Sequence, residues 1–315
     1  MDQNAADCDR IEFLTNLISN LNSNSGASKC SPKDSLEDTP KAHRVSKSTS
    51  SPDASVDEKL KRHMLCLMET EAYKSHLQDR KELPIYQEKE TILGTLRNAL
   101  GNVIVVSGLT GSGKSTQIPQ IILQEELLAG RGSTTNIICT QPRRISATSI
   151  ASRVSEELGE GTETGGLVGY QIRMESSTSD LTRLLFCTTG ILLKRLESDP
   201  DLTGVNFVIM DEVHERNLDS DFLLIVMKRL MQRRSNIKLI LMSATMDAEK
   251  FAEYFECPVI KVGGRLFDVK SYFLEDMIEM TSYILDEQSE YAKRMIGDTS
   301  KKSSNVKIHV SHFFL

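Results

Sequence analysis

The chain has 315 residues, which corresponds to about two domains at most. Its apolar fraction of 39% and charged fraction of 26% are typical of a soluble globular protein with a solvated part. The net charge of −6 excludes a wholly basic, histone-like nucleic-acid coat but allows a local basic groove. The sequence shows no secretory signal and no run of about 18 apolar residues, so we expect no membrane contact. The six cysteines show no CxxC spacing, which favours reduced thiols and a cytoplasmic location, with a nuclear one as the alternative.

The N-terminal part is predicted to be a disordered region over residues 1–56, followed by a helical lead-in over 57–83. Residues 23–55 are rich in Ser, Lys, Asp, Pro and Asn, and such a composition buries too little apolar area to offset the entropy of ordering. Before them, apolar residues from Ile11 to Leu21 recur at helical spacing. They form either a short helix that docks on a protein partner or a frayed helix without one.

From residue 84 the pattern becomes an alternation of short β-branched runs and helical segments. We predict an initial helix over 88–100 and then strands at Val103–Val106, Asn136–Thr140, Gly169–Ile172, Leu184–Cys187, Val205–Met210 and Lys238–Met242. The helices predicted between them are Lys114–Leu128, Ile145–Leu158, Gly190–Leu196 and Ser220–Arg233. This alternation predicts an α/β domain with a parallel sheet over residues 84–265. Residues 266–315 are interpreted as the truncated start of the next region, with a helical, acidic stretch at 272–296.

The first predicted strand leads directly into GLTGSGKST, residues 108–116, and then into a helix. This G-x-x-x-x-G-K-[ST] pattern between strand and helix is typical of a P-loop, whose backbone N–H groups and helix N-terminus bind phosphate. Lys114 can reach the β- and γ-phosphates, and the Ser115 hydroxyl is placed to bind Mg²⁺. The predicted nucleotide-binding residues are Gly108, Thr110, Gly111, Ser112, Gly113, Lys114, Ser115 and Thr116.

Two adjacent carboxylates follow the apolar run Val208–Met210, in the sequence DEVHE. Beside a P-loop, Asp211 would hold Mg²⁺ and Glu212 would take a proton from the attacking water. The alternative is a charged turn after a buried strand.

Three further strand ends carry polar side chains. Ser243-Ala244-Thr245 either hydrogen-bonds to a neighbouring loop or forms an ordinary turn. TQPRRISA, residues 140–147, places two arginines and two hydroxyls beside a helix N-terminus, which suits a phosphate backbone but also a solvated arginine pair. GYQIR, residues 169–173, and Thr188-Thr189-Gly190 offer similar surfaces, so a nucleic-acid backbone could be bound along this edge.

Taken together, GLTGSGKST, TQPRRISA, CTTGILL, DEVHER and SAT resemble motifs I, Ia, Ib, II and III of the DEAH/RHA-type (DExH-box) superfamily 2 RNA helicases. The resemblance covers about residues 84–265, a first RecA-like domain, and VGYQIRMES is most similar to the RNA helicase A branch. It implies a RecA-like P-loop NTPase that uses ATP and Mg²⁺ to bind and unwind RNA.

The resemblance also implies roles for individual residues. Lys114 and Ser115 hold phosphate and Mg²⁺, while Asp211, Glu212 and His214 are catalytic. Ser243 and Thr245, together with His214, couple the nucleotide state to RNA binding. Arg153 stacks on the adenine, so loose nucleotide selectivity is expected. The residues implied to contact the backbone of single-stranded RNA are Arg143, Arg144, Arg173 and Thr189. RKELPI, residues 80–85, resembles the R-x-x-L-P stretch that leads into the domain.

The sequence also departs from the family pattern. Asp268 stands where a proline is expected, and no Q-R-x-G-R-x-G-R sequence, which supplies the arginine fingers, is present in the 315 residues. A finger contributes roughly 10³–10⁵ in rate, so a catalytically incomplete NTP- and RNA-binding or scaffold fragment is the alternative to an active helicase. Another P-loop enzyme, such as a nucleotide kinase, leaves TQPRR, DEVH and SAT unexplained.

Overall fold

The computed structural model describes residues 52–98, 102–244, 247–264 and 269–281. The chain divides into two compact units, Met1–Arg265 and Leu266–Leu315. The division falls at the residue where the sequence predicts the end of the RecA-like domain. The disorder and the short helix expected within residues 1–51 lie outside the described residues, as does most of the stretch 282–315.

Four helices precede the sheet: α2 (Ala54–Glu69), α3 (Glu71–Lys81), α4 (Pro84–Gln87) and α5 (Lys89–Asn98). The Asp53 carboxylate accepts hydrogen bonds from two backbone N–H groups of the first turn of α2, and the Thr70 hydroxyl accepts one from α3. Because Asp53 caps the helix, residues 54–56 are helical, although their composition assigns them to the disordered region.

Strands and helices then alternate along the chain, as the sequence predicts. The strands are β1 (Val103–Gly108), β2 (Ile137–Gln141), β3 (Val168–Ile172), β4 (Glu175–Ser177), β5 (Leu184–Thr188), β6 (Phe207–Met210), β7 (Lys238–Ser243) and β8 (Val259–Val262). The helices are α6 (Lys114–Leu128), α7 (Arg144–Glu157), α8 (Thr189–Ser198), the short 3-10 helix η1 (Val213–Glu215), α9 (Leu218–Arg233) and α10 (Ala248–Phe255).

The sheet has the strand order β4-β3-β5-β2-β6-β7-β1-β8, and every pairing is parallel except that of β4 with β3. The carboxyl ends of the parallel strands therefore meet at one edge. Along this edge lie, in order, the segments after β3, β5, β2, β6, β7 and β1. Ligands of such sheets bind at this edge.

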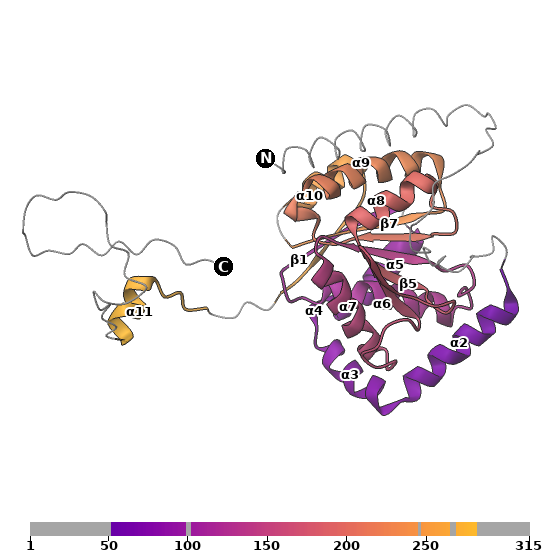
Figure 1. Ribbon diagram of the computed structural model, residues 1–315, viewed down its shortest axis with the longest axis horizontal. Helices are drawn as coiled ribbons and strands as arrows, with labels where there is room; N and C mark the ends of the chain where they lie inside the picture. Colours follow the sequence, from indigo (N-terminus) through magenta and orange to yellow (C-terminus); the bar gives the residue numbers. More distant parts are fainter. Residues whose placement is uncertain (1–51, 99–101, 245–246, 265–268, 282–315) are drawn as a thin grey trace, which may run out of the picture. The chain divides into compact units, whose positions relative to one another are not determined.

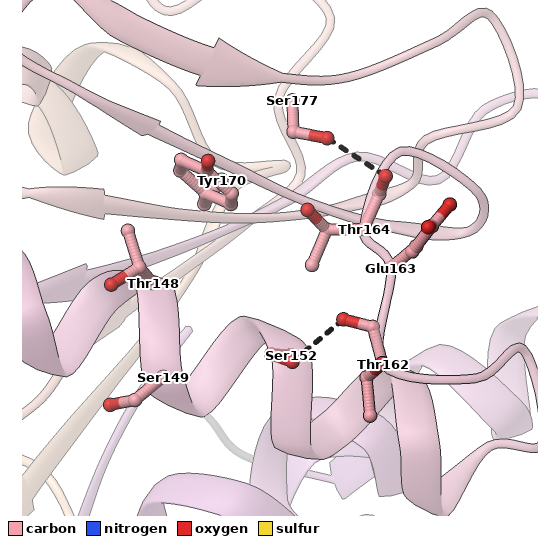
Figure 2. A pocket seen from close by; sticks show the side chains of 8 residues that line it. All are labelled: Thr148, Ser149, Ser152, Thr162, Glu163, Thr164, Tyr170 and Ser177. Atoms are coloured by element: carbon pink, nitrogen blue, oxygen red, sulfur yellow. Dashed lines mark hydrogen bonds between the residues drawn. The ribbon is translucent and has the colours of Figure 1, made fainter.

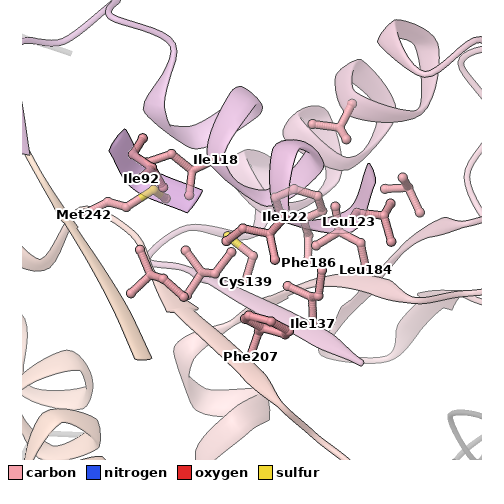
Figure 3. Packing of buried hydrophobic residues seen from close by; sticks show 14 of the residues in the cluster. Ile92, Ile118, Ile122, Leu123, Ile137, Cys139, Leu184, Phe186, Phe207 and Met242 are labelled. Atoms are coloured by element: carbon pink, nitrogen blue, oxygen red, sulfur yellow. The ribbon is translucent and has the colours of Figure 1, made fainter. Parts of the chain in front are cut away.

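Two apolar cores cover the two faces of the sheet, since successive side chains of a strand point to opposite faces. Ile104 and Val106 of β1 join a core with helices α2 to α7, whereas Val103 and Val105 join a core with α8, α9 and α10. Figure 1 shows these helices on opposite sides of the sheet. Figure 3 shows the first core, where α6 packs over the strands.

The sequence analysis missed four short elements: α4, β4, α10 and β8. In the second unit, α11 (Leu274–Thr281) lies within the helical stretch expected over 272–296, and the remainder of that stretch lies outside the described residues. Among the described helices, none has the length and apolarity that crossing a bilayer requires. The described cysteines Cys66, Cys139, Cys187 and Cys257 are free thiols.

Candidate functional site

The P-loop connects β1 to α6 and turns at two glycines with positive φ, Gly111 at 82° and Gly113 at 88°. Residues with a side chain rarely adopt these angles, so glycine is required for this turn. Gly108 lies so close to β8 that a Cβ atom there would be 3.0 Å from the Val262 Cβ atom. The loop is thus held between a neighbouring strand and the N-terminus of α6, the end of a helix that attracts anions.

Lys114 is the first residue of α6, and its ammonium group folds over the loop. Its Nζ atom donates to the carbonyl oxygens of Gly108, at 2.5 Å, and of Leu109, at 3.0 Å. Burial lowers the pKa of Lys114, and the nearby carboxylates Asp211 and Glu212 oppose that shift. A buried ammonium in this position would gain strongly from a polyphosphate.

Asp211 follows β6 and is almost completely buried. It accepts hydrogen bonds from the Gln141 side-chain amide at 2.8 Å, from the Glu212 backbone N–H at 2.9 Å, and from the Ser115 hydroxyl. Burial raises the pKa of Asp211, and these hydrogen bonds and Lys114 lower it in part. The structure therefore brings together Ser115 and Asp211, the two oxygen donors predicted to hold Mg²⁺. A Mg²⁺ ion is usually bound by one or two such protein oxygens together with water and substrate phosphates. In keeping with this, no set of three or more His, Cys, Asp or Glu residues that could hold a metal occurs in the described part of the chain.

Glu212 has a positive φ of 52°, and Arg216, at the other end of η1, has a φ of 50°. Such values are uncommon for residues with a Cβ atom and occur often at functional sites. Glu212 is half-buried, and burial, followed by the charge of Asp211, raises its pKa. A carboxylate that is partly shielded from water and less acidic than usual is suited to accept a proton.

His214 lies between Glu212 and the end of β7. Its Nδ1 atom accepts a hydrogen bond from the Ala244 backbone N–H at 3.2 Å and lies 3.3 Å from a Glu212 carboxylate oxygen. Accepting from Ala244 requires an unprotonated Nδ1, so the neutral ring carries its proton on Nε2. The link between the two strand ends thus passes through the Ala244 backbone, while Ser243 is fully buried and Thr245 lies outside the described residues.

Arg153, expected to stack on the base, lies on α7. Its Nε donates to Glu157 at 2.8 Å and its Nη1 to Glu156 at 3.3 Å. Its side chain is 48% exposed. Arg153 is thus fixed at one end and open to solvent at the other.

The arginines expected to bind RNA lie at the ends of β2 and β3. Arg143 and Arg144 at the start of α7 and Arg173 in the β3–β4 turn are all exposed. Arg143 forms an ion pair with Glu215, with Nη2 and Oε1 3.0 Å apart. Thr189 is different, because its side chain is only 5% exposed and the accessible residue at this strand end is Gly190.

A hollow of about 540 Å³ lies away from the P-loop, between α7 and the loop that precedes β3 (Figure 2). It is lined by Thr148, Ser149, Ser152, Thr162, Glu163, Thr164, Tyr170 and Ser177. Two of its hydroxyls are bound to backbone carbonyls, Ser152 to Thr162 at 2.7 Å and Ser177 to Thr164 at 2.8 Å. Its lining contains no lysine or arginine, so it offers no charge to a phosphate.

The sequence analysis did not single out three residues that take part in the site. Gln141 fixes Asp211, Glu215 pairs with Arg143, and Glu157 holds Arg153. Gln141 and Glu215 belong to the quoted motifs, and their position at strand ends beside charged residues was the available signal. Glu157 gives no such signal, because glutamate on a helix is usually exposed.

Comparison with known proteins gives a consistent result. The family model for the DEAD/DEAH box helicase matches residues 86–254. ATP-dependent RNA helicase DHX29 of Homo sapiens is 48% identical over 245 residues, which is 76% of this chain and 18% of that protein. Putative ATP-dependent RNA helicase DHX57 of Homo sapiens is 53% identical over 224 residues, 71% of this chain and 16% of that protein. The DExH-box ATP-dependent RNA helicase DExH1 of Arabidopsis thaliana is 51% identical over 225 residues, 71% of this chain and 22% of that protein.

The chain therefore spans less than a quarter of the length of these relatives. The family match extends from α4 to α10 and includes the P-loop, the DEVH segment and the strand ends between them. Because this match covers more than half of the 315 residues, the chain belongs to the DEAD/DEAH box helicase family.

Proposed function

We propose that this chain is the nucleotide-binding part of an ATP-dependent RNA helicase, which hydrolyses ATP with Mg²⁺ and couples hydrolysis to RNA binding. The observation that carries the proposal is the hydrogen bond between Ser115 of the P-loop and Asp211 of the DEVH segment, beside the Lys114 ammonium. Three neighbouring strands, β6, β7 and β1, supply these residues.

In this proposal, the P-loop N–H groups and Lys114 bind the phosphates, and Ser115 and Asp211 hold Mg²⁺, directly or through its water. Mg²⁺ would neutralise the charge that develops on the phosphoryl oxygens. Glu212 accepts the proton of the attacking water, and His214 transmits the change to the end of β7 through Ala244.

RNA is the proposed partner at the other half of the same sheet edge. Arg143, Arg144 and Arg173 follow β2 and β3 and are exposed, which suits contacts to phosphates of a single strand. The printed names of the relatives DHX29 and DHX57 as ATP-dependent RNA helicases support this partner.

Steady-state ATP hydrolysis by the full 315-residue chain, with and without single-stranded RNA, tests the proposal. We expect RNA to stimulate turnover. Lys114→Ala should abolish nucleotide binding, whereas Glu212→Gln should retain Mg²⁺·ATP and stop hydrolysis because it preserves shape and removes the base. ATP and RNA binding without turnover would support the scaffold alternative, and turnover that persists in folded Lys114→Ala would refute the assigned site.

A further inference from the structure

A buried hydrogen-bond network lies beside the P-loop and is centred on Glu157, at the end of α7. One carboxylate oxygen of Glu157 accepts from the side-chain amides of Gln117, at 2.8 Å, and Gln120, at 2.6 Å. The other oxygen accepts from Arg153 Nε at 2.8 Å. The residue is only 3% exposed, and a carboxylate is stable at such a depth only when it is hydrogen-bonded and paired with a cation.

The N-terminal helices supply a second cation to this network. Arg80, at the end of α3, is 1% exposed, and its Nε donates to Gln117 at 2.8 Å and lies 3.8 Å from the Glu157 carboxylate. Its guanidinium also faces the rings of Tyr73 and Tyr86, at 5.7 and 5.8 Å from their centres. Among the described residues, nothing accepts a hydrogen bond from its Nη1 or Nη2 atom. Burying two unused donor atoms is costly, so the charge of Arg80 has to serve Glu157.

The inner end of the network contacts the phosphate-binding loop. The Gln117 amide, which binds Glu157, lies 3.0 Å from the Thr116 hydroxyl of the P-loop. The Ile85 backbone N–H donates to the Ser112 carbonyl at 3.2 Å, so the stretch that begins at Arg80 packs directly on the loop. The outer end of the network is Arg153, whose side chain is half exposed.

From this arrangement we propose that Glu157 is a positioning residue for nucleotide recognition, which holds the Arg153 guanidinium beside the P-loop helix so that it stacks on the base of a nucleoside triphosphate. The inference rests on the proposed nucleotide site. A guanidinium donates hydrogen bonds within its own plane, so the bonds to Glu157 and Glu156 leave its flat faces available to a base. Stacking accepts any base, so the site would take nucleoside triphosphates as a class.

Glu157→Gln is the variant that tests this role. The unused Gln120 Oε1 atom can accept from the new amide after rotation of the Gln120 side chain, so the network can close again. Arg153 would then bind a neutral oxygen, and such bonds are about half as strong as charge-assisted ones. Glu156→Gln is the matched control, because Glu156 also contacts Arg153 but is exposed.

Calorimetric titration of the full chain with Mg²⁺·ATP and with Mg²⁺·tripolyphosphate, which lacks a base, separates positioning from support of the P-loop. We expect Glu157→Gln to weaken ATP binding about five-fold, which is about 1 kcal/mol, and to leave tripolyphosphate binding unchanged. Glu156→Gln should change neither. Equal losses for both ligands, or no loss for ATP, would overturn the positioning role. Failure of the parent chain to bind either ligand would instead refute the proposed nucleotide site.

A double-mutant cycle with Arg153→Ala gives the second readout. If Glu157 acts through Arg153, Glu157→Gln should have no further effect on ATP affinity in the Arg153→Ala background. Additive losses would overturn the inference. Gln120→Met, which removes one donor to Glu157 while keeping a side chain of similar volume, should show the same dependence on Arg153. It keeps the inference open to refutation even if Glu157→Gln does not fold.

Discussion

At the residue scale, Asp211 shows how the site trades stability for function. Its carboxylate is 4% exposed, and the hydrogen bonds from Ser115, Gln141 and the Glu212 backbone compensate only in part for burial, because the pKa remains raised. In the unfolded chain the same group has an ordinary pKa near 3.8. The folded state therefore binds this proton more tightly than the unfolded state does. Asp211 thus destabilises the fold once pH rises through its folded pKa, and stability is recovered at lower pH.

Asp211→Asn should therefore stabilise the ligand-free domain at neutral pH, because the amide carries no charge and still accepts the hydrogen bonds. We expect the melting temperature to rise by about 2–4 °C for each kcal/mol gained. The difference from the parent chain should shrink as pH falls toward about 4, where the parent carboxylate becomes protonated. Thermal melts across this pH range check the prediction. Adding Mg²⁺·ATP should stabilise the parent chain only, and a lower melting temperature of the variant at pH 7 would contradict the interpretation.

The chemical core of the site could be predicted from sequence because its residues are adjacent in short motifs. Lys114 and Ser115 come with their own strand, loop and helix, and Asp211 follows an apolar run. The partners that fix them could not be found in the same way, because Gln141 and Asp211 meet only through the pairing of β2 with β6. The orientation of Thr189 is likewise set by tertiary packing, which buries it at the start of α8.

At the scale of elements, the strand order separates two functions along one edge. The P-loop and the DEVH segment follow β1 and β6, with β7 between them, while the exposed arginines follow β2 and β3. Since β2 and β6 are neighbours, the two halves meet there, and the ion pair between Arg143 and Glu215 spans the junction. An exposed pair of this kind contributes only about 0–1 kcal/mol to stability, so its significance lies in competition for Arg143.

Glu215→Gln should raise the affinity for single-stranded RNA, because Glu215 then no longer competes with phosphate for the Arg143 guanidinium. We expect a gain of about two- to five-fold at low salt, within the range of an exposed ion pair. Arg143→Ala should lower the affinity equally for two unrelated RNAs and reduce the salt dependence by about 0.7 per lost contact. Fluorescence anisotropy titrations over a salt series measure both effects.

The control for this prediction is Glu253→Gln, which removes an exposed charge from α10 on the opposite face of the sheet. It should leave RNA affinity nearly unchanged. If Glu215→Gln gives the same gain in the Arg143→Ala background, the two side chains do not compete. In that case the effect would be one of net charge.

Element prediction from sequence succeeded where the pattern is long and failed where it is short. The bounds of α6 match the prediction, because its apolar periodicity runs over four turns between glycines. Strands β4 and β8 have only three and four residues, and α4 has four, so they carry too few residues for a periodic signal. The existence of β8 depends on its pairing with β1, which is a tertiary feature.

At the scale of the whole molecule, the charged lead-in is part of the core of the first unit. The sequence predicts a solvated helix at the edge of the domain, and its polar face agrees with that. Yet Leu60 and Met64 of α2 and Tyr73 of α3 are buried in the same core as the P-loop helix α6. In addition, the Asp57 carboxylate accepts from the Ser133 backbone N–H at 2.6 Å, which anchors α2 to the loop before β2.

Removal of residues 1–83 should therefore destabilise the nucleotide-binding domain, although the family match begins only at residue 86. The shortened chain would expose the apolar surface that α2 and α3 cover and would lose Arg80, the buried partner of Glu157. We expect aggregation or a clearly lower melting temperature, whereas a chain that begins at residue 52 should melt like the full one. Thermal melts of the three chains, with and without Mg²⁺·ATP, measure this.

Two point variants on α2 separate loss of packing from loss of chain length. Leu60 is 1% exposed and packs against Gly132, whereas Leu65 on the same helix is 46% exposed. Leu60→Ala should cost about 2–5 kcal/mol of unfolding free energy, the usual range for a buried leucine. Leu65→Ala should stay within about 0.5 kcal/mol of the parent chain, as surface substitutions usually do. If both variants and the chain lacking residues 1–83 melt at the parental temperature, the lead-in helices are an appendage, and the domain begins where the family match begins. If Leu60→Ala alone is destabilised, the functional domain starts at α2, about 30 residues before that match, because its core is incomplete without these helices.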